Sequence, residues 1–147
     1  MREPREEPRE KGRGARPSAL WYVAPAALYV AYIFVMGTAE NAEPPMDVSD
    51  KTAHVAAFGL MVPFLTRALR YFLPAAPRGR LVLAAAAFSS LAGALLEFWQ
   101  AFLPYRSAEV LDWVADTIGA VLAACLTALA WCLARTARDE ETSGSGA

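Results

Sequence analysis

Cysteine and histidine are scarce in this chain, and charge is scarce within its long apolar stretches. Its 147 residues include two cysteines and one histidine. Cys125 and Cys132 are seven residues apart, which separates their Cα atoms by about 10 Å on a helix. A disulfide needs a shorter Cα separation, so the two cysteines do not pair with each other. We interpret both as small apolar residues, which carry no information about the redox compartment.

The distribution of charge excludes several classes of protein. Hydrophobic residues make up 56% of the chain and charged residues 20%, and the charges lie mostly in the tails and loops. No sustained alternation of polar and apolar residues predicts strands, and no internal repeat is present. Basic residues alternate with glutamate in the N-terminal tail and are then divided between loops, so nucleic acid is not an expected partner. The pattern is typical of a small integral membrane protein whose main partner is the lipid bilayer.

Four apolar stretches each approach the roughly 20 residues that a helix needs to cross a bilayer. We therefore predict an all-α fold, an integral membrane bundle of four transmembrane helices that fills residues 17–134. The expected helices cover about 17–37, 51–73, 81–103 and 110–134. Residues 1–16 are rich in charge, proline and glycine, and they are expected to form a disordered tail, as are residues 135–147.

The first apolar stretch has an alternative interpretation as a signal peptide. Gly37, Thr38 and Ala39 resemble a cleavage site, although the apolar run is longer than a typical signal core. Pro25 lies within the stretch, and a spanning helix tolerates such an interruption when neighbouring helices satisfy the freed carbonyl.

The positions of lysine and arginine predict the orientation of the helices. Basic residues are enriched in cytoplasmic loops and flanks. The connection between the first two helices has none before Lys51, whereas the next connection has four, and the third has only Arg106. The basic residues of the tails and the second connection are Arg2, Arg5, Arg9, Lys11, Arg13, Arg16, Arg67, Arg70, Arg78, Arg80, Arg135 and Arg138. Both termini and the second connection are therefore expected to be cytoplasmic.

Three polar clusters interrupt the apolar stretches, and this topology places all three at the outer face. Ionisable groups within spanning helices are costly, and they usually face one another or water. Spacings of three or four residues put the members of each cluster on one helix face. The candidate acid/base residues are His54, Glu97 and Asp116; the candidate binding residues are Asp50, Lys51, Gln100, Arg106 and Asp112. We expect them to line one polar pocket.

Such a pocket combines carboxylates, an imidazole, an amide and nearby cations. This inventory is suited to acid/base chemistry, to a divalent metal or to an anionic head group, and the sequence does not choose among them. Gly119 lies one turn beyond Asp116, and Gly93 one turn before Glu97. Both glycines are expected to permit close approach of helices.

The residues of these clusters resemble the VanZ-like family of bacterial membrane proteins. The resemblance rests on DKTAHVAAFGLMVPFL and on EFWQAFLPYRSAEVLDWVADTIGAVL, and it covers residues 50–121. Pro104 and Gly119 also occupy signature positions. Asp116 stands where the family usually has Asn, which adds an ionisable group, and Tyr105 stands where Gly is common. The resemblance implies a multi-pass protein of the bacterial cytoplasmic membrane, and the family takes its name from glycopeptide resistance.

The same residues support two interpretations of function. In the first, the pocket binds or modifies a lipid-linked component of the cell envelope, with His54 and Glu97 as the acid/base pair. In the second, the polar residues form an interhelical network without catalytic function, and Asp50 is simply a helix N-cap. An ion pathway is disfavoured because the inner halves of the last two helices contain no ionisable residue.

Overall fold

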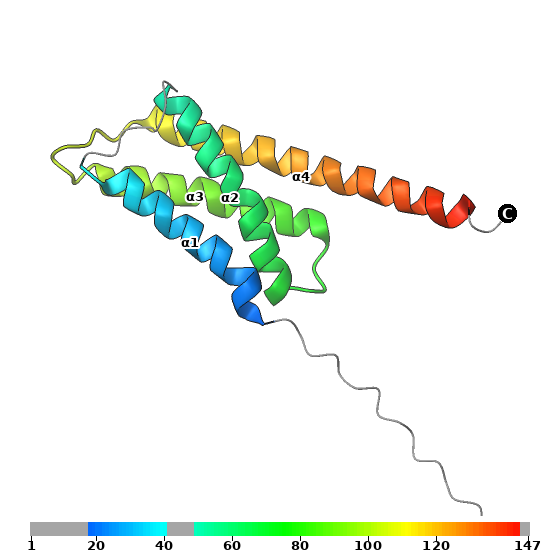
Figure 1. The fold of residues 1–147 in the computed structure, drawn as a ribbon. Coiled ribbons are helices and arrows are strands. Elements are labelled where there is room, and N and C mark those ends of the chain that lie inside the picture. The colour runs from blue at the N-terminus through cyan, green and yellow to red at the C-terminus, as the bar shows by residue number, and fades with distance from the viewer. Residues whose placement is uncertain (1–17, 41–48, 145–147) are drawn as a thin grey trace, which may run out of the picture.

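The computed structural model describes residues 18–40 and 49–144. These residues form four helices and no strand: α1 (Ala19–Thr38), α2 (Asp50–Phe72), α3 (Arg78–Gln100) and α4 (Val110–Gly144) (Figure 1). Each helix is long and apolar enough to cross a membrane. The predicted all-α membrane bundle is therefore confirmed.

The helix bounds differ from expectation mainly at the C-terminal end. Residues 135–144 were expected to be disordered, but α4 continues through them to Gly144. This stretch contains alanine, arginine and glutamate but no proline, so its composition favours a helix. Residues 1–16, the other expected tail, lie outside the described residues. At its C-terminal end, which is predicted to face outward and is called the outer end below, α3 stops at Gln100, so Glu97 lies within the last turn.

The start of α2 shows which residue caps the helix. Ser49 is the N-cap, and its hydroxyl oxygen accepts a hydrogen bond from the backbone N–H of Thr52 at 3.3 Å. The alternative in which Asp50 caps this helix is therefore wrong. Asp50 is the first helical residue and is exposed.

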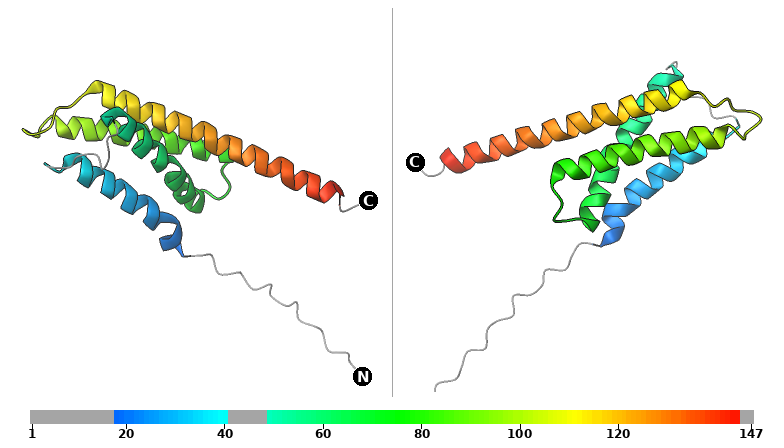
Figure 2. Two further views of the ribbon diagram at one scale, coloured as in Figure 1. Left: turned by 45° about the horizontal axis from the view of Figure 1, so that its top comes forward. Right: turned by 180° about the vertical axis from the view of Figure 1, so that it is seen from behind.

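The second helix is central to the bundle. It contacts each of the other three helices, whereas α1 and α4 share no contact among the described residues (Figures 1 and 2). One apolar cluster joins α1, α2 and α3, and a second joins α2, α3 and α4. Their buried members are Ile33, Phe58, Met61 and Leu96, then Val62, Ala85, Ala86 and Ala120. Many large apolar side chains remain exposed along the sides of the bundle, as expected for helices that face lipid.

Glycine sets the closest approach between α2 and α4. A Cβ atom on Gly119 would collide with the backbone carbonyl oxygen of Val55, and one on Gly59 would lie 3.0 Å from the carbonyl oxygen of Gly119. The close helix contact predicted at Gly119 is confirmed. Gly93 has a different role, because a Cβ there would collide with the carboxylate of Asp116. Close packing at these glycines brings three polar side chains together.

Candidate functional site

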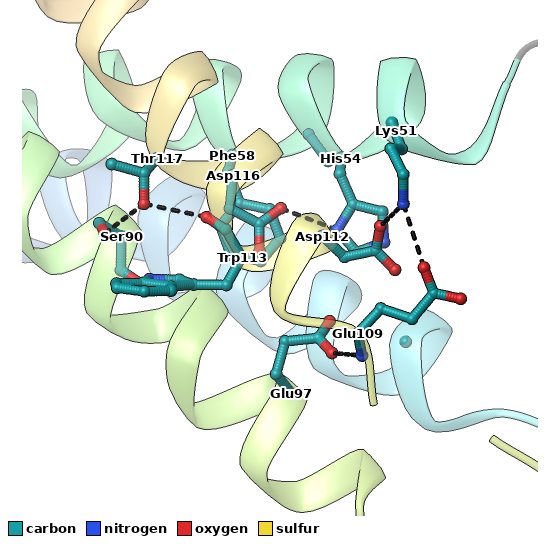
Figure 3. A network of polar contacts seen from close by, with 12 residues as sticks. Lys51, His54, Phe58, Ser90, Glu97, Glu109, Asp112, Trp113, Asp116 and Thr117 are labelled. Atoms are coloured by element: carbon teal, nitrogen blue, oxygen red, sulfur yellow. Dashed lines mark hydrogen bonds and ion pairs between the residues drawn. The ribbon is translucent and has the colours of Figure 1, made fainter. Parts of the chain in front are cut away.

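One polar side chain from each of three helices meets near the outer end of the bundle. His54 comes from α2, Glu97 from α3 and Asp116 from α4 (Figure 3). The metal-ligating atoms of the three side chains lie within 4.8 Å of one another. We call these residues the central triad. The structure thus brings together the three residues chosen from the sequence as acid/base candidates.

Asp116 is the most deeply buried member of the central triad. Its side chain has 0% exposure, and its Oδ1 lies 2.8 Å from Nδ1 of His54. The other oxygen, Oδ2, is buried and has no hydrogen-bond partner. Gly93 leaves the space that this oxygen occupies. Because a buried carboxylate oxygen without a donor is costly, Oδ2 is a position where a ligand would be stabilised.

Glu97 shows the same half-satisfied arrangement. The residue is 8% exposed, and its Oε2 accepts a hydrogen bond of 2.8 Å from the backbone N–H of Glu109. This bond holds the residue that precedes α4, where helix N–H groups have no partner within the helix. The second oxygen, Oε1, is buried without a partner. Glu97 therefore both positions the start of α4 and offers a free acceptor.

A second group of charges lies closer to the outer surface. The ammonium group of Lys51 donates to Oδ1 of Asp112 at 2.7 Å and to Oε2 of Glu109 at 3.1 Å (Figure 3). Asp112 is buried, whereas Lys51 is half exposed. Asp50, His54 and Asp112 also have ligand atoms within 4.8 Å of one another. Lys51 is thus already engaged by two carboxylates.

The remaining candidate residues contact the end of α1. Gln100 donates to the carbonyl oxygen of Gly37 at 2.8 Å, and Arg106 donates to that of Ala39 at 2.7 Å. The hydroxyl of Tyr105 donates to the carbonyl oxygen of Thr38 at 3.1 Å. The last carbonyls of a helix have no partner within it, so these three side chains cap the end of α1. Gln100 and Arg106, which were predicted to bind a ligand, therefore hold the end of α1 in this arrangement.

The balance of charge determines what the central triad can accept. Glu97, Asp112 and Asp116 are three carboxylates, while Lys51 and His54 are the nearby groups that can carry positive charge. The two unpartnered oxygens, Oε1 of Glu97 and Oδ2 of Asp116, are acceptors and would repel an anion. A divalent ion with mixed nitrogen and oxygen ligands, such as Zn²⁺ or Mn²⁺, suits one imidazole and two carboxylates. A bare phosphate does not.

Two grooves flank the outer half of α4. The groove between α3 and α4 has a volume of about 270 Å³, and only Glu97 and Glu109 among its lining residues carry charge. Its apolar lining residues are Ala94, Phe98, Ala101, Ala108, Val110 and Trp113. The groove between α2 and α4 has a volume of about 360 Å³ and includes Lys51. Both grooves combine apolar walls with residues of the polar network.

Several polar contacts between helices were not anticipated from the sequence. Ser89 is buried and donates to the carbonyl oxygen of Phe58 at 2.7 Å, and the hydroxyls of Ser90 and Thr117 lie 2.7 Å apart. The indole of Trp113 donates to the carbonyl oxygen of Ser90 at 3.2 Å. Serine and threonine within apolar helices are the signal that identifies such contacts, because small polar residues favour helix interfaces in membranes.

Comparison with known proteins assigns the chain to a family. The model of the VanZ/LLP1 family matches residues 16–131, which include all four helix cores and the whole central triad. No curated protein and no solved structure matches the chain significantly. Because the family match covers most of the chain, it confirms the resemblance carried by the polar motifs. The chain belongs to the VanZ/LLP1 family.

Proposed function

We propose that the outer polar site binds the head group of a lipid-linked cell-envelope component, which reaches the site from within the bilayer. The chain would lie in the bacterial cytoplasmic membrane with both termini in the cytoplasm. The observation that supports this most directly is the α3–α4 groove, whose walls are apolar except at Glu97 and Glu109. Such a groove suits an amphipathic ligand with a hydrocarbon portion and a polar head.

The charges of the site favour a cation as part of the bound state. Lys51 is held by Asp112 and Glu109, and Arg106 donates to the end of α1. Both cations are therefore engaged outside the central triad. A divalent ion held by His54, Glu97 and Asp116 would attract a phosphate-bearing head group, and each of the two carboxylates has one oxygen without a hydrogen-bond partner.

The experiment measures both binding partners separately. The full chain, purified in detergent, is titrated with Mn²⁺ and then with a polyprenyl phosphate, and a neutral polyprenol of equal length serves as the comparison ligand. Glu97→Gln and Asp116→Asn keep the shape of each side chain and remove its charge. We expect each to weaken Mn²⁺ binding tenfold or more, by analogy with losses around metal sites, and polyprenyl phosphate retention to fall in parallel.

The control variant is Glu40→Gln, which makes the same substitution at an exposed position beyond α1. It should bind both ligands as the unaltered chain does. Helix content and a single elution peak establish that each variant is folded. If folded Glu97→Gln and Asp116→Asn proteins bind Mn²⁺ and polyprenyl phosphate normally, the proposal is wrong.

A second candidate function is a non-catalytic network that locks the bundle. It is favoured by the capping of α1 by Gln100 and Arg106 and by the bond between Glu97 and the Glu109 backbone. In that case the unaltered chain binds neither Mn²⁺ nor polyprenyl phosphate, and the same variants lower stability alone.

A further inference from the structure

A third cavity lies at the opposite end of the bundle from the central triad. Its volume is about 460 Å³, and it draws residues from all four helices. We call it the arginine cleft and define it by Thr66, Arg67, Arg70, Arg78, Trp131 and Arg138. His54 and Arg67 are separated by about 20 Å along α2. The distribution of basic residues predicts that this end faces the cytoplasm.

The charge of the arginine cleft has one sign. Four arginines line it, and among the described residues no aspartate or glutamate does. No ion pair joins Arg67, Arg70 or Arg78 to another described residue. Like charges gathered around one cavity repel one another, and an anion between them would relieve this repulsion.

Neutral partners hold these arginines in place. Arg67 donates to the carbonyl oxygen of Trp21 at 3.0 Å, and its guanidinium lies 5.1 Å from the centre of the Tyr22 ring. Arg70 donates to the carbonyl oxygen of Ala76 at 3.0 Å, and Arg78 lies over the ring of Trp131 at 5.5 Å. A guanidinium has five N–H donors, so one carbonyl bond or ring contact orients it while leaving donors for a ligand.

A buried hydroxyl supplies an independent sign of a ligand. Thr66 is 4% exposed, and its Oγ1 is buried without a hydrogen-bond partner. Buried hydroxyls are nearly always hydrogen-bonded in folded proteins. Thr66 lines the same cavity as the arginines, together with the apolar surfaces of Pro63 and Trp131. The cleft thus offers several donors beside a surface suited to hydrocarbon.

We propose that the arginine cleft binds the phosphate group of an anionic phospholipid from the cytoplasmic leaflet. The guanidinium groups donate to the phosphate oxygens, which is the pairing that planar guanidinium groups favour. The hydroxyl of Thr66 donates a further bond, and the acyl chains lie against Pro63, Trp131 and the neighbouring apolar helix surfaces. This site is separate from the outer one, so neither proposal depends on the other.

The test compares lipids that differ only in head-group charge. The full chain, purified in detergent, is mixed with equal amounts of phosphatidylglycerol and phosphatidylcholine of the same acyl composition. Native mass spectrometry then gives the ratio of the two bound lipids. We expect phosphatidylglycerol to be preferred, and Arg67→Gln or Arg78→Gln to reduce the preference about fivefold each, the effect of one basic residue near anionic lipid.

Matched controls separate a built site from general surface charge. Arg80→Gln and Arg135→Gln remove the same charge from exposed residues that do not line the cleft, and they should leave the preference unchanged. Thr66→Val keeps the side-chain shape and removes the hydroxyl, and it should weaken retention severalfold. Helix content and elution position show that each variant is folded.

Three results would overturn the proposal. The first is equal retention of the two lipids by the unaltered chain. The second is an equal loss of preference in the Arg80→Gln and Arg67→Gln proteins, which would assign the effect to surface charge. The third is displacement of phosphatidylglycerol by glycerol 3-phosphate at an equal concentration, which would identify a soluble phosphate compound as the ligand. Glu97→Gln should not alter the preference for phosphatidylglycerol. The two proposals can therefore fail independently of each other.

Discussion

The two ends of this bundle organise charge in opposite ways. At the outer end, buried carboxylates from α3 and α4 meet His54, and Lys51 pairs with two further acids. At the other end, arginines gather around a cavity that is lined by no acidic residue of the described ranges. The outer end is held together by its own opposite charges, whereas Arg67, Arg70 and Arg78 at the other end have no acidic partner among the described residues.

This difference follows from how far each charged side chain can extend out of the hydrocarbon. Arginine has a long side chain that reaches the interface while its stem stays among apolar groups. Aspartate is short, so Asp116 stays buried where its helix places it, with His54 as the partner of one oxygen and Gly93 leaving room for the other. Substitutions should therefore affect folding more strongly at the outer end than at the inner end.

The largest expected effect is at His54. Replacing His54 with alanine leaves Asp116 buried without its partner, and breaking one side of a buried pair costs about 3–5 kcal/mol of the free energy of unfolding. Reversible unfolding in mixed micelles measures this loss. Asp116→Asn in the His54→Ala background should recover part of it, because the uncompensated charge is then removed. If the free energy of unfolding of the His54→Ala protein is within about 1 kcal/mol of that of the unaltered chain, the comparison is contradicted.

The next effect is at the contact between α2 and α4. Gly119→Ala places a Cβ against the carbonyl oxygen of Val55, so the helices must separate, at a cost of about 1–3 kcal/mol. Gly79→Ala is the matched control, because a Cβ on Gly79 meets nothing within 4 Å. Alanine at Gly79 should stabilise α3 by about 0.5–1 kcal/mol. Thermal unfolding of both proteins should therefore shift in opposite directions.

A smaller effect is expected where α3 caps α1. Gln100→Ala removes the bond to the carbonyl oxygen of Gly37 and should cost about 1 kcal/mol, as for other interhelical bonds in membranes. Hydrogen exchange should increase near the end of α1. Tyr105→Phe removes an exposed bond to the next carbonyl and should change exchange less. Equal protection in the Gln100→Ala protein would show that this cap contributes nothing.

The smallest effect is expected at Lys51. Its side chain is 47% exposed, and solvent-exposed ion pairs contribute little to stability. Lys51→Gln should therefore lower the unfolding free energy less than any variant above, and the difference should vanish at high salt. A loss that persists at high salt would show that Asp112 depends on this lysine as Asp116 depends on His54.

The sequence predicted the parts of the fold that periodicity and composition control. Four apolar stretches predicted the number and positions of the helices, and the placement of the three polar clusters at one face predicted that His54, Glu97 and Asp116 would meet. Gly119 was also predicted to lie at a close helix contact, because a glycine beside a polar residue of a spanning helix permits such an approach.

Other features depend on backbone groups and on relative helix directions, which leave no local pattern. Gln100 and Arg106 donate to carbonyls of α1, and a carbonyl is present at every residue, so their partners could not be recognised. The arginine cleft likewise requires the inner parts of all four helices in one arrangement. From the sequence, Arg67 and Arg70 indicated only that the second connection is cytoplasmic.

The length of α4 has a consequence for what lies beyond the bundle. Its 35 residues extend for about 50 Å, whereas the hydrocarbon of a bilayer is about 30 Å thick. In Figure 1 its C-terminal half continues past the other helices. If α4 is perpendicular to the membrane, its final turns lie well outside the hydrocarbon. If α4 is tilted, the protein occupies a larger area of one leaflet. The angle of α4 to the membrane therefore determines how far from the bilayer a soluble protein could contact this helix.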